Sequence, residues 1–408
     1  MGEKIPRSLL RGASYLKNMS KSKKTVYLDY AATTPVHPQA LRAMLPYFST
    51  QFGNSMSLYN MGREARSVLE KSRQQIAKII SVKPSGIIFT GSATESNNLA
   101  IKGVALANKD RGRHIIISSI EHPCIMQSAD FLEKHAGFTV TRLKVDKFGL
   151  INPNDVAKAI TKQTTLVSIM HASNEIGTIE PISKIGKICH DKDVLFHTDA
   201  SQTFGKLPIN ANRMEVDLLT ASSHKIYGPK GAAFLYVRPG TKIQPILHGG
   251  SHEFGLRPST VNIPAIVGFA KAATICAKQM AIEGTRLASL RDKLVKDILT
   301  KIPHSRLNGH PKLRLANNAN ISFDFVEGES IILSLDVLGI AASTGSACSS
   351  DKLEPSHVLL AIGLRHEQAH GSLRLTLGRQ TKKEDIDYVL KALPKIIKNL
   401  RAISPFKI

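Results

Sequence analysis

The chain has 408 residues, 42% of them hydrophobic and 21% charged, the composition of a globular protein with room for two or three domains. No stretch approaches the roughly 18 to 20 uninterrupted apolar residues that a membrane span needs. Residues 1–24 lack the apolar core of a secretory signal. Four cysteines without a C-x-x-C pair indicate neither a disulfide framework nor a zinc site, which favours a reducing compartment.

The net charge of +23 is the unusual feature of the composition. Part of it lies at the ends, because Glu3 is the one acid in the basic stretch 1–24 and residues 391–408 carry no acid. Such a balance suits nucleic acid or another anionic partner. No motif that reads RNA or DNA accompanies it, so we favour a merely basic surface.

Residues 1–24 are predicted to form a basic N-terminal arm, with Met19 as an alternative start. The segment is rich in Arg and Lys and poor in acids, as organellar transit peptides are, but it is not clearly amphipathic. We therefore expect a cytoplasmic protein. A mitochondrion-related organelle is the alternative if residues 1–24 are a transit peptide.

In chain order, helical and strand patterns alternate. Residues 62–80 place Val68, Leu69 and Ile76 with other apolar side chains on one helical face. Short apolar runs then predict strands at Ile87–Thr90, His114–Ser118, Thr165–Met170, Val194–His197, Asp217–Thr220 and Ala232–Val237. Helical segments such as 181–193 lie between several of them. This alternation is typical of a mostly parallel sheet in an α/β domain.

The pattern changes after about residue 280. A long helical pattern covers 285–302, and alternating strand patterns follow at 319–325 and 372–378. We predict a large α/β domain over residues 25–281 and a smaller α+β C-terminal domain over residues 282–408.

Polar side chains follow the predicted strands at their carboxyl ends, where open α/β sheets bind ligands. The stretch "TGSATESNN" (90–98) offers hydroxyls and free backbone N–H groups at a helix start, which suit a phosphate. His122, Asp199 and Lys225 follow three further strands. Singly, Asp199 could cap a helix and His122 could be a core histidine. Together they are what pyridoxal phosphate requires, with Lys225 as the Schiff-base lysine and Asp199 keeping the ring nitrogen protonated.

At these residues the sequence resembles the cysteine desulfurases, from residue 26 to about residue 389. The resemblance is carried by "ATESNN", "EH", "NEIGTIEPI", "HTDASQTFGKLPI", "SSHKIYGPKG", "GLRPSTVNIPAIVG", "STGSACSS", "LEPSHVL" and "GSLRLTLGR". It implies a pyridoxal-phosphate-dependent sulfurtransferase that converts L-cysteine to L-alanine. The implied fold is α/β: a large domain with a mostly parallel sheet of the aspartate-aminotransferase fold, and a smaller α+β C-terminal domain.

The resemblance also assigns residues to the cofactor phosphate. By position in the motifs these are Ala93, Thr94, Ser222 and His224. Thr260 would reach the phosphate across the interface of a homodimer.

Further residues are assigned by the resemblance to the cofactor ring and the substrate. His122 would be catalytic and stack on the ring, whereas Asn174 and Gln202 would hold the ring oxygen and Asp199 the ring nitrogen. Arg374, with Asn174, would bind the substrate carboxylate. A planar guanidinium suits such a two-point bond.

Among the cysteines, Cys348 is distinct, because "ASTGSACSSDK" has the composition of a mobile loop. The resemblance, to the long-loop Gly-Ser-Ala-Cys group of the family, implies that Cys348 takes the sulfur as a persulfide. It implies at most a transient contact with an iron–sulfur cluster and no stable metal site. Cys189 and Cys276 lie in apolar helical patterns and are predicted core residues. Cys124, two residues after His122, could lie near the site.

Some positions depart from the pattern of the family. These are, among others, Ser55, Tyr59, His252 and Ser259. They flank the expected cofactor mouth, so they bear on the fine substrate geometry and on the contact across the dimer.

The stretch "HEQAH" (366–370) matches the H-E-x-x-H zinc signature. That motif needs a helix long enough to present both histidines on one face. Gly363 lies just upstream and Gly371 follows at once, so we do not expect a zinc site here.

The expected partners are L-cysteine, a second copy of the chain, an iron–sulfur scaffold or other sulfur-acceptor protein, and a tRNA-thiolation partner, without a membrane. Two alternatives stay open. One is a selenocysteine lyase-like relative, and the other is a catalytically silent basic scaffold or RNA-associated protein.

Overall fold

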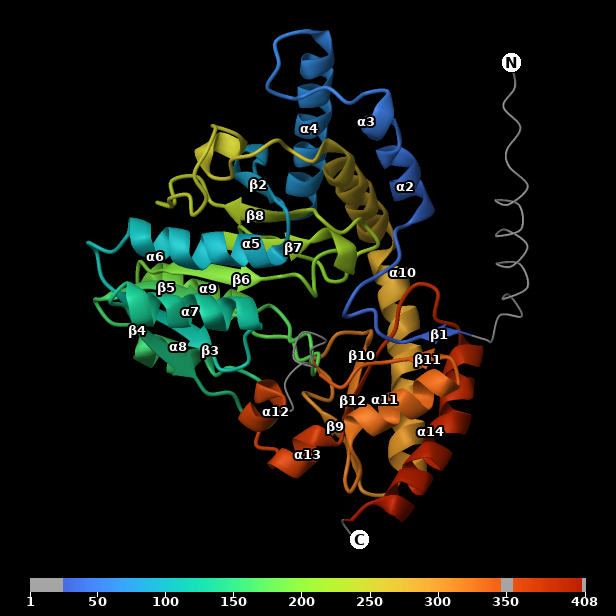
Figure 1. Ribbon diagram of the computed structural model, residues 1–408. Helices are drawn as coiled ribbons and strands as arrows, with labels where there is room; N and C mark the ends of the chain where they lie inside the picture. Colours follow the sequence, from blue (N-terminus) through green and yellow to red (C-terminus); the bar gives the residue numbers. More distant parts are fainter. Residues whose placement is uncertain (1–24, 346–354, 406–408) are drawn as a thin grey trace, which may run out of the picture.

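The computed structural model describes residues 25–345 and 355–405. A larger layered part and a smaller part share one long helix, α10 (Ile263–Lys301), which runs through both (Figure 1). The centre of the larger part is a seven-stranded sheet in the order β2-β8-β7-β6-β5-β3-β4. Its strands in this order are Ile87–Thr90, Ala233–Val237, Leu218–Ser222, Leu195–Asp199, Thr164–Ser168, His114–Ser118 and Thr139–Leu143.

The large sheet is mostly parallel, as predicted. Strand β8 alone runs antiparallel to its neighbours β2 and β7, so β2 and β7 point the same way as β6, β5, β3 and β4. The predicted strands Ile87–Thr90 and His114–Ser118 agree with β2 and β3 to the residue. The expected α/β fold class is confirmed.

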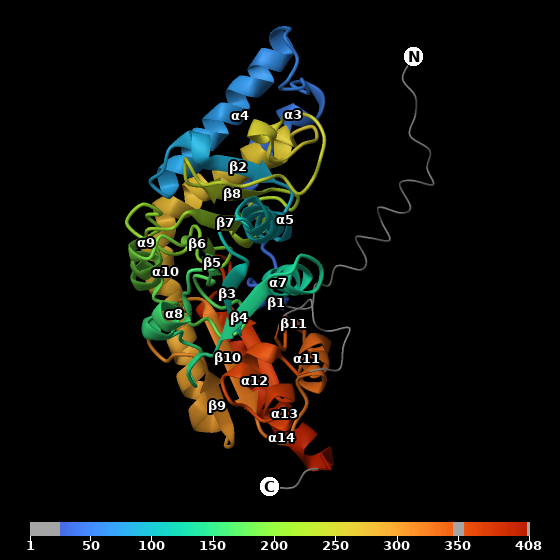
Figure 2. The same cartoon turned by 90° about the vertical axis from the view of Figure 1, so that its left-hand side faces the viewer.

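Helices cover both faces of this sheet (Figure 2). One face carries α4 (Asn60–Ile79), α8 (Pro153–Ala159), α9 (Ile182–Asp191) and the first half of α10. The other carries α5 (Ala93–Asn98), the π-helical η2 (Leu99–Gly103), α6 (Val104–Ala107) and α7 (Pro123–His135).

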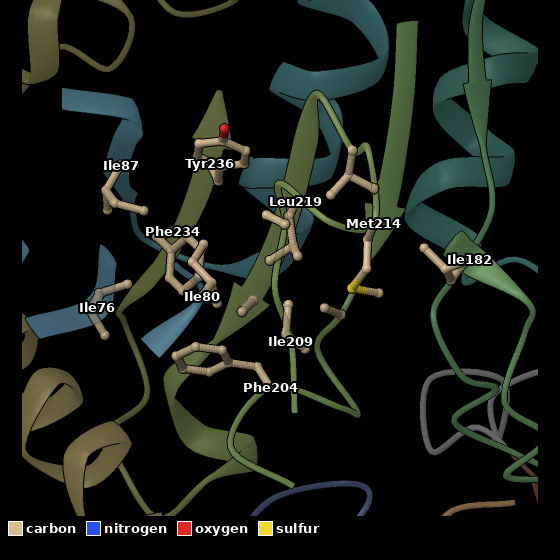
Figure 3. Packing of buried hydrophobic residues seen from close by; sticks show 14 of the residues in the cluster. Ile76, Ile80, Ile87, Ile182, Phe204, Ile209, Met214, Leu219, Phe234 and Tyr236 are labelled. Atoms are coloured by element: carbon tan, nitrogen blue, oxygen red, sulfur yellow. The ribbon is translucent and has the colours of Figure 1, made fainter. Parts of the chain in front are cut away.

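Successive side chains of a strand point to opposite faces of the sheet, so each strand contributes residues to both of these layers. In β3, Ile116 packs with the α4 and α9 layer, whereas Ile115 and Ile117 pack with the α5 and α7 layer. Figure 3 shows the first layer, where Phe204 and Phe234 meet edge to face with ring centroids 5.2 Å apart. Both faces of the strands are therefore apolar, which is why they read as continuous apolar runs.

The smaller part has its own sheet and core. Strand β10 (Asn318–Phe323) lies between β9 (Ser305–Asn308) and β12 (Ser372–Thr376), antiparallel to both. The short strands β1 (Val26–Tyr27) and β11 (Ile340–Ala341) pair in parallel. Helices α11 (Gly328–Val337) and α14 (Lys383–Ile403) pack on this core.

The remaining elements are short. They are α2 (Pro38–Met44), α3 (Pro46–Ser49), η1 (Pro84–Gly86), η3 (Ser223–Lys225), η4 (Glu253–Gly255), α12 (His357–Ala361) and α13 (His366–His370). The "HEQAH" stretch is thus a helix of five residues.

Helix α10 belongs to both cores. Phe269 packs with the large sheet and Leu294 with the small one, and both are fully buried. By length and apolar composition α10 could cross a bilayer, but its apolar side chains fill the two cores instead. The division predicted between residues 281 and 282 falls inside this helix, and Leu28 packs with the C-terminal core. The domain limits themselves stay predictions.

Candidate active site

The carboxyl ends of β2, β3, β5, β6 and β7 meet at one edge of the large sheet, since these strands all point the same way. The polar loops that the sequence placed after these strands therefore come together there. Two of the predicted residues, Asp199 and Lys225, lie close enough to a third, His122, for their charges to affect it.

Lys225 ends η3, directly after β7. Its ammonium donates hydrogen bonds to the carbonyls of Ala31 at 2.6 Å and Ala32 at 2.7 Å. The segment 31–32 is far from Lys225 in the sequence, so the fold brings an early part of the chain to the lysine.

Asp199 is the last residue of β6 and is buried. Asn97 donates to its Oδ2 at 2.7 Å, and the backbone N–H of Ser201 donates to its Oδ1 at 2.8 Å. These donors fix the position of the Asp199 side chain inside the protein.

His122 caps the N-terminus of α7, where its Nδ1 accepts the backbone N–H of Cys124 at 3.2 Å. Burial lowers the pKa of His122, and the positive charge of Lys225 lowers it further, against the opposing effect of Asp199. The imidazole is therefore neutral at neutral pH.

The residues assigned to the phosphate lie at two neighbouring strand ends. Ala93 and Thr94 open α5, where the hydroxyl of Ser92 accepts the N–H of Glu95 at 3.1 Å. Ser222 and His224 lie at the end of β7 and in η3. Burial, with Lys225 second, lowers the pKa of His224 to about 4, so this ring is neutral and can donate or accept a hydrogen bond.

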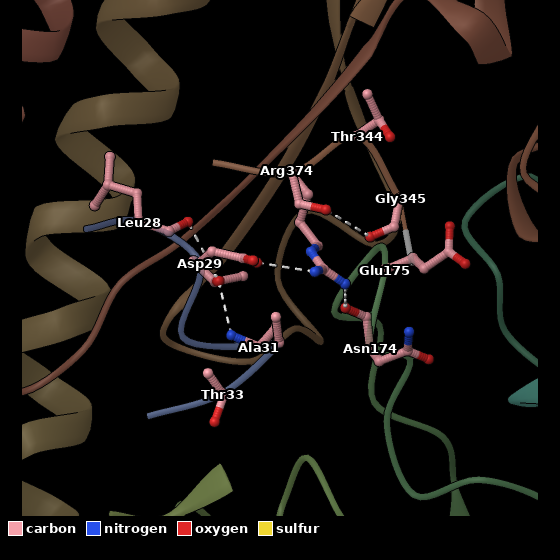
Figure 4. A network of polar contacts seen from close by, with 12 residues as sticks. Leu28, Asp29, Ala31, Thr33, Asn174, Glu175, Thr344, Gly345 and Arg374 are labelled. Carbon is pink, nitrogen blue, oxygen red and sulfur yellow. Dashed lines mark hydrogen bonds and ion pairs between the residues drawn. The ribbon is translucent and has the colours of Figure 1, made fainter. Parts of the chain in front are cut away.

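Arg374 lies in β12 of the small sheet and reaches the large part (Figure 4). Its Nη2 donates to Asp29 at 2.9 Å and its Nη1 to the carbonyl of Asn174 at 3.0 Å. The Nε is buried without a hydrogen-bond partner in the described chain. Because guanidinium has five N–H donors, Nε and the second Nη2 hydrogen remain for a planar acceptor such as a carboxylate.

Gln202 also joins the cluster. Its Nε2 donates to the carbonyl of Ala31 at 3.0 Å, and its Oε1 accepts from Lys206 at 3.3 Å. Burial, with Lys225 second, lowers the pKa of Lys206 to about 7.

Two predicted residues lie apart from this cluster or outside the described residues. Thr260 is exposed in the loop before α10, and in the described chain no hydrogen bond joins it to the other site residues. Cys348 falls in residues 346–354, outside the described residues.

The four unusual positions differ in their surroundings. Ser55 is buried and Tyr59 is exposed at the start of α4. Both ring nitrogens of His252 are buried without a hydrogen-bond partner in the described part of the chain. Ser259 adopts φ 89°, where glycine is favoured.

Sequence reasoning missed Asn97 and Asp29, which hold Asp199 and Arg374. It also missed the role of Glu121, the neighbour of His122. Its Oε1 accepts the hydroxyl of Ser118 at 2.7 Å and the N–H of Met170 at 2.8 Å. Burial raises the pKa of Glu121 to about 8.

The raised pKa of Glu121 has a consequence for stability. The folded protein keeps this proton between pH 4.5 and about 8, whereas the unfolded chain has released it. This group's contribution to stability is full below that window and is lost as pH rises through it, by about 1.4 kcal/mol per pH unit. Glu121→Gln should remove that loss. In denaturant titrations, the free energy of unfolding of the variant should therefore rise relative to that of wild type as the pH increases from 5 to 8. Glu329 is exposed, so Glu329→Gln is the control. If the pH dependence of the unfolding free energy were the same in Glu121→Gln and in wild type, Glu121 would be charged in the folded state.

No group of three or more His, Cys, Asp or Glu side chains in residues 25–345 and 355–405 is arranged to hold a metal ion.

The donor set fits pyridoxal phosphate. A buried carboxylate at Asp199 suits a protonated ring nitrogen, and the amine of Lys225 suits a carbonyl carbon. The start of α5, with Ser222 and His224 beside it, suits the phosphate, since the structure records no acceptor in the described chain for the N–H groups of Ala93 and Thr94.

Comparison with known proteins identifies the family. The profile of the family Aminotransferase class-V matches residues 26–389. The chain is 51% identical over 385 residues to the cysteine desulfurase IscS of Dictyoglomus turgidum, covering 94% of this chain and 98% of that protein. It is 48% identical to the cysteine desulfurase IscS of Methanosarcina thermophila, covering 95% and 96%.

The fold agrees with solved structures. A NifS-like protein superposes with a TM-score of 0.87 at 36% identity and covers 92% of this chain and 100% of its own. A NifS-like protein from Rickettsia africae superposes with a TM-score of 0.83 at 29% identity, with the same coverage. The chain therefore belongs to the class-V aminotransferase family and, within it, to the cysteine desulfurases.

Proposed function

We propose that the protein removes the sulfur of L-cysteine, leaves L-alanine, and holds the sulfur as a persulfide on Cys348. The observation that carries this proposal is the meeting of Lys225, Asp199 and His122 at one sheet edge, with Arg374 reaching in from the small sheet. The relatives named above support the substrate. Equal release of alanine and sulfide from L-cysteine in the presence of a reductant is the test.

The overall reaction balances without an added oxidant. L-Cysteine and the thiol of Cys348 give L-alanine and Cys348–S–SH, so the carbon–sulfur bond of the substrate breaks and a sulfur–sulfur bond forms. A reductant or an acceptor thiol then takes the outer sulfur and restores the thiol.

Pyridoxal phosphate is the cofactor, and it supplies an electron sink that draws charge from the Cα of the substrate. Lys225 would hold it covalently, and Asp199, fixed by Asn97, would keep its ring nitrogen protonated. Arg374 would bind the substrate carboxylate and so orient the Cα–H bond. His122 would hold or pass a proton beside the reacting atoms.

A catalytically silent scaffold is not favoured, because Lys225 and Asp199 both act on His122 at the sheet edge and Arg374 binds the carbonyl of Asn174. Selenocysteine would use the same carboxylate site. No described residue favours it over cysteine.

Arg374→Ala should lower kcat/KM for cysteine by about 30-fold to 1000-fold while the cofactor stays bound. The reason is the loss of a charge-assisted, two-point bond in a dry site, which costs about 2 to 4 kcal/mol. Steady-state kinetics measure it, with thermal unfolding as a check because the variant also loses the ion pair with Asp29. Arg374→Lys keeps the positive charge but lacks the planar guanidinium with its two parallel N–H donors, so it should recover only part of the loss. An unchanged kcat/KM in Arg374→Ala would place the carboxylate site elsewhere.

We also propose a homodimer. Exposed apolar side chains are concentrated in residues 36–61, over α2, α3 and the start of α4, which is typical of an interface. They are Val36, Leu41, Leu45, Phe48, Phe52, Met56, Leu58, Tyr59 and Met61. A dimer would also give the exposed Thr260 a phosphate to bind. Sedimentation at twice the chain mass of 44.5 kDa is expected, and a monomer at micromolar concentration would contradict the proposal.

The sulfur acceptor we propose is an iron–sulfur scaffold protein, with tRNA thiolation as a second outlet. Transfer of radiolabelled sulfur from the loaded enzyme to each candidate acceptor tests this, and transfer to neither would contradict it.

The compartment we propose is the cytoplasm. Fluorescent fusions with and without residues 1–24 test the compartment, since an organellar signal only in the longer fusion would contradict it.

A further inference from the structure

A chain of contacts links His122 to Asp199 through Cys124 and Asn97. The Nδ1 of His122 lies 3.0 Å from the sulfur of Cys124. The Nδ2 of Asn97 lies 3.2 Å from the same sulfur and 2.7 Å from Oδ2 of Asp199. The chain thus joins the start of α7, helix α5 and the end of β6.

The contacts allow the donors and acceptors along this chain to be assigned. The amide of Asn97 has two N–H bonds, so it donates one to Asp199 and one to the sulfur of Cys124. The opposite orientation would set its carbonyl oxygen against the carboxylate of Asp199, with two acceptors facing each other. The sulfur of Cys124 accepts from Asn97 and also meets the side chain of Thr94, and we assign its S–H to Nδ1 of His122, the nearer acceptor in this chain of contacts.

The ring of His122 then carries its proton on Nε2. Its Nδ1 accepts twice, from the S–H and from the backbone N–H of Cys124 at 3.2 Å. A neutral imidazole has one donor and one acceptor nitrogen, so two donors at Nδ1 fix the tautomer.

Cys124 remains a thiol in this position. Burial, with Asp199 second, raises its pKa to about 12, and a protonated thiol donates a hydrogen bond but is a poor nucleophile. This separates Cys124 from the sulfur-accepting role given to Cys348.

We propose that Cys124 is a positioning residue that holds His122 in the Nε2–H form, anchored to Asp199 through Asn97. The inference deepens the proposed function and rests on it. His122 then enters the reaction with a proton to give at Nε2, not with a vacant site to receive one. The titration of His122 also depends on the groups that face it, which are Asp199 from β6, Lys225 from η3 and His357 from α12.

The test is the titration of His122 in the full-length, cofactor-loaded protein, followed by nitrogen NMR of ¹⁵N-histidine. The signals are assigned by their loss in His122→Asn. In wild type, Nδ1 should show the shift of an unprotonated nitrogen and Nε2 that of a protonated one. Cys124→Ala should raise the pKa of His122 by about half a unit to one unit, since one donor to the neutral ring is lost. Cys124→Ser keeps an O–H donor and should restore the wild-type titration.

Cys189→Ala removes a buried thiol from α9 and serves as the control, with no expected shift. An unchanged tautomer and titration in Cys124→Ala would overturn the inference. So would equal shifts in the alanine and serine variants, or the same shift in Cys189→Ala. No cysteine substrate enters the measurement, so its failure in an active desulfurase leaves the proposed function standing. A confirmed titration in a protein that releases no sulfide would instead overturn the function.

Discussion

Lys225→Ala is expected to abolish turnover of cysteine and the covalent attachment of the cofactor together. Lys225 ends η3 at the strand edge that carries Asp199 and His122, and its amine is anchored on the carbonyls of Ala31 and Ala32. Removal of the amine takes away the covalent link and a proton carrier. The rate should fall by more than the roughly 10²-fold to 10⁴-fold that acid–base catalysis alone contributes.

The measurement is borohydride reduction followed by denaturation. Wild type should keep the cofactor on the peptide that contains Lys225, and the variant should keep none. Lys230→Ala is the matched control, because Lys230 is exposed in the turn that follows η3, and it should behave as wild type. A variant of Lys225 that still holds a reducible linkage would assign the role to another lysine.

The sequence predicted the buried strands of the large sheet well and missed the more exposed strand β4. Strands β2 and β3 are buried throughout and apolar at their centres, because helices cover both faces of the sheet. Strand β4 lies at the edge, and its five residues "TVTRL" are mostly exposed or half-buried, so no apolar run marks it. In the first half of α10 the sequence indicated an apolar helical pattern at Cys276, but it did not predict that this pattern and the one over 285–302 form a single helix.

One general rule predicted the strand-end residues of the site, and the residues to which that rule does not apply were missed. Ligands bind beyond the carboxyl ends of parallel strands, and that rule gathered Asp199 and Lys225. No local pattern reveals that Asp29 pairs with Arg374, because 345 positions separate them. The buried ion pair of Arg73 with Glu253 spans 180 positions and is equally invisible in the sequence. Such partners depend on the packing of the two cores.

Cys348→Ser is expected to stop sulfide release while the cofactor remains bound. Both ends of the segment that carries Cys348 meet the same residue. Ser356 donates to Glu175 at 2.5 Å, and Gly345 lies so close that an added Cβ would meet Oε2 of Glu175 at 2.9 Å. Glu175 follows Asn174, whose carbonyl binds Arg374, so the described residues Gly345 and Ser356 that flank the segment both lie near the proposed carboxylate site (Figure 4).

Because an alcohol is a far weaker nucleophile than a thiolate, the serine variant should release sulfide more than about 100-fold more slowly. Mass spectrometry after incubation with cysteine should find one extra sulfur atom on Cys348 in wild type and none in the variant. Ser350→Ala changes a neighbour in the same segment and should keep both the adduct and the rate. The carrier assignment fails if the added sulfur is found on Cys124, or if Cys348→Ser releases sulfide at the wild-type rate. Cys124 is not expected to substitute, since burial keeps its thiol protonated with a pKa of about 12.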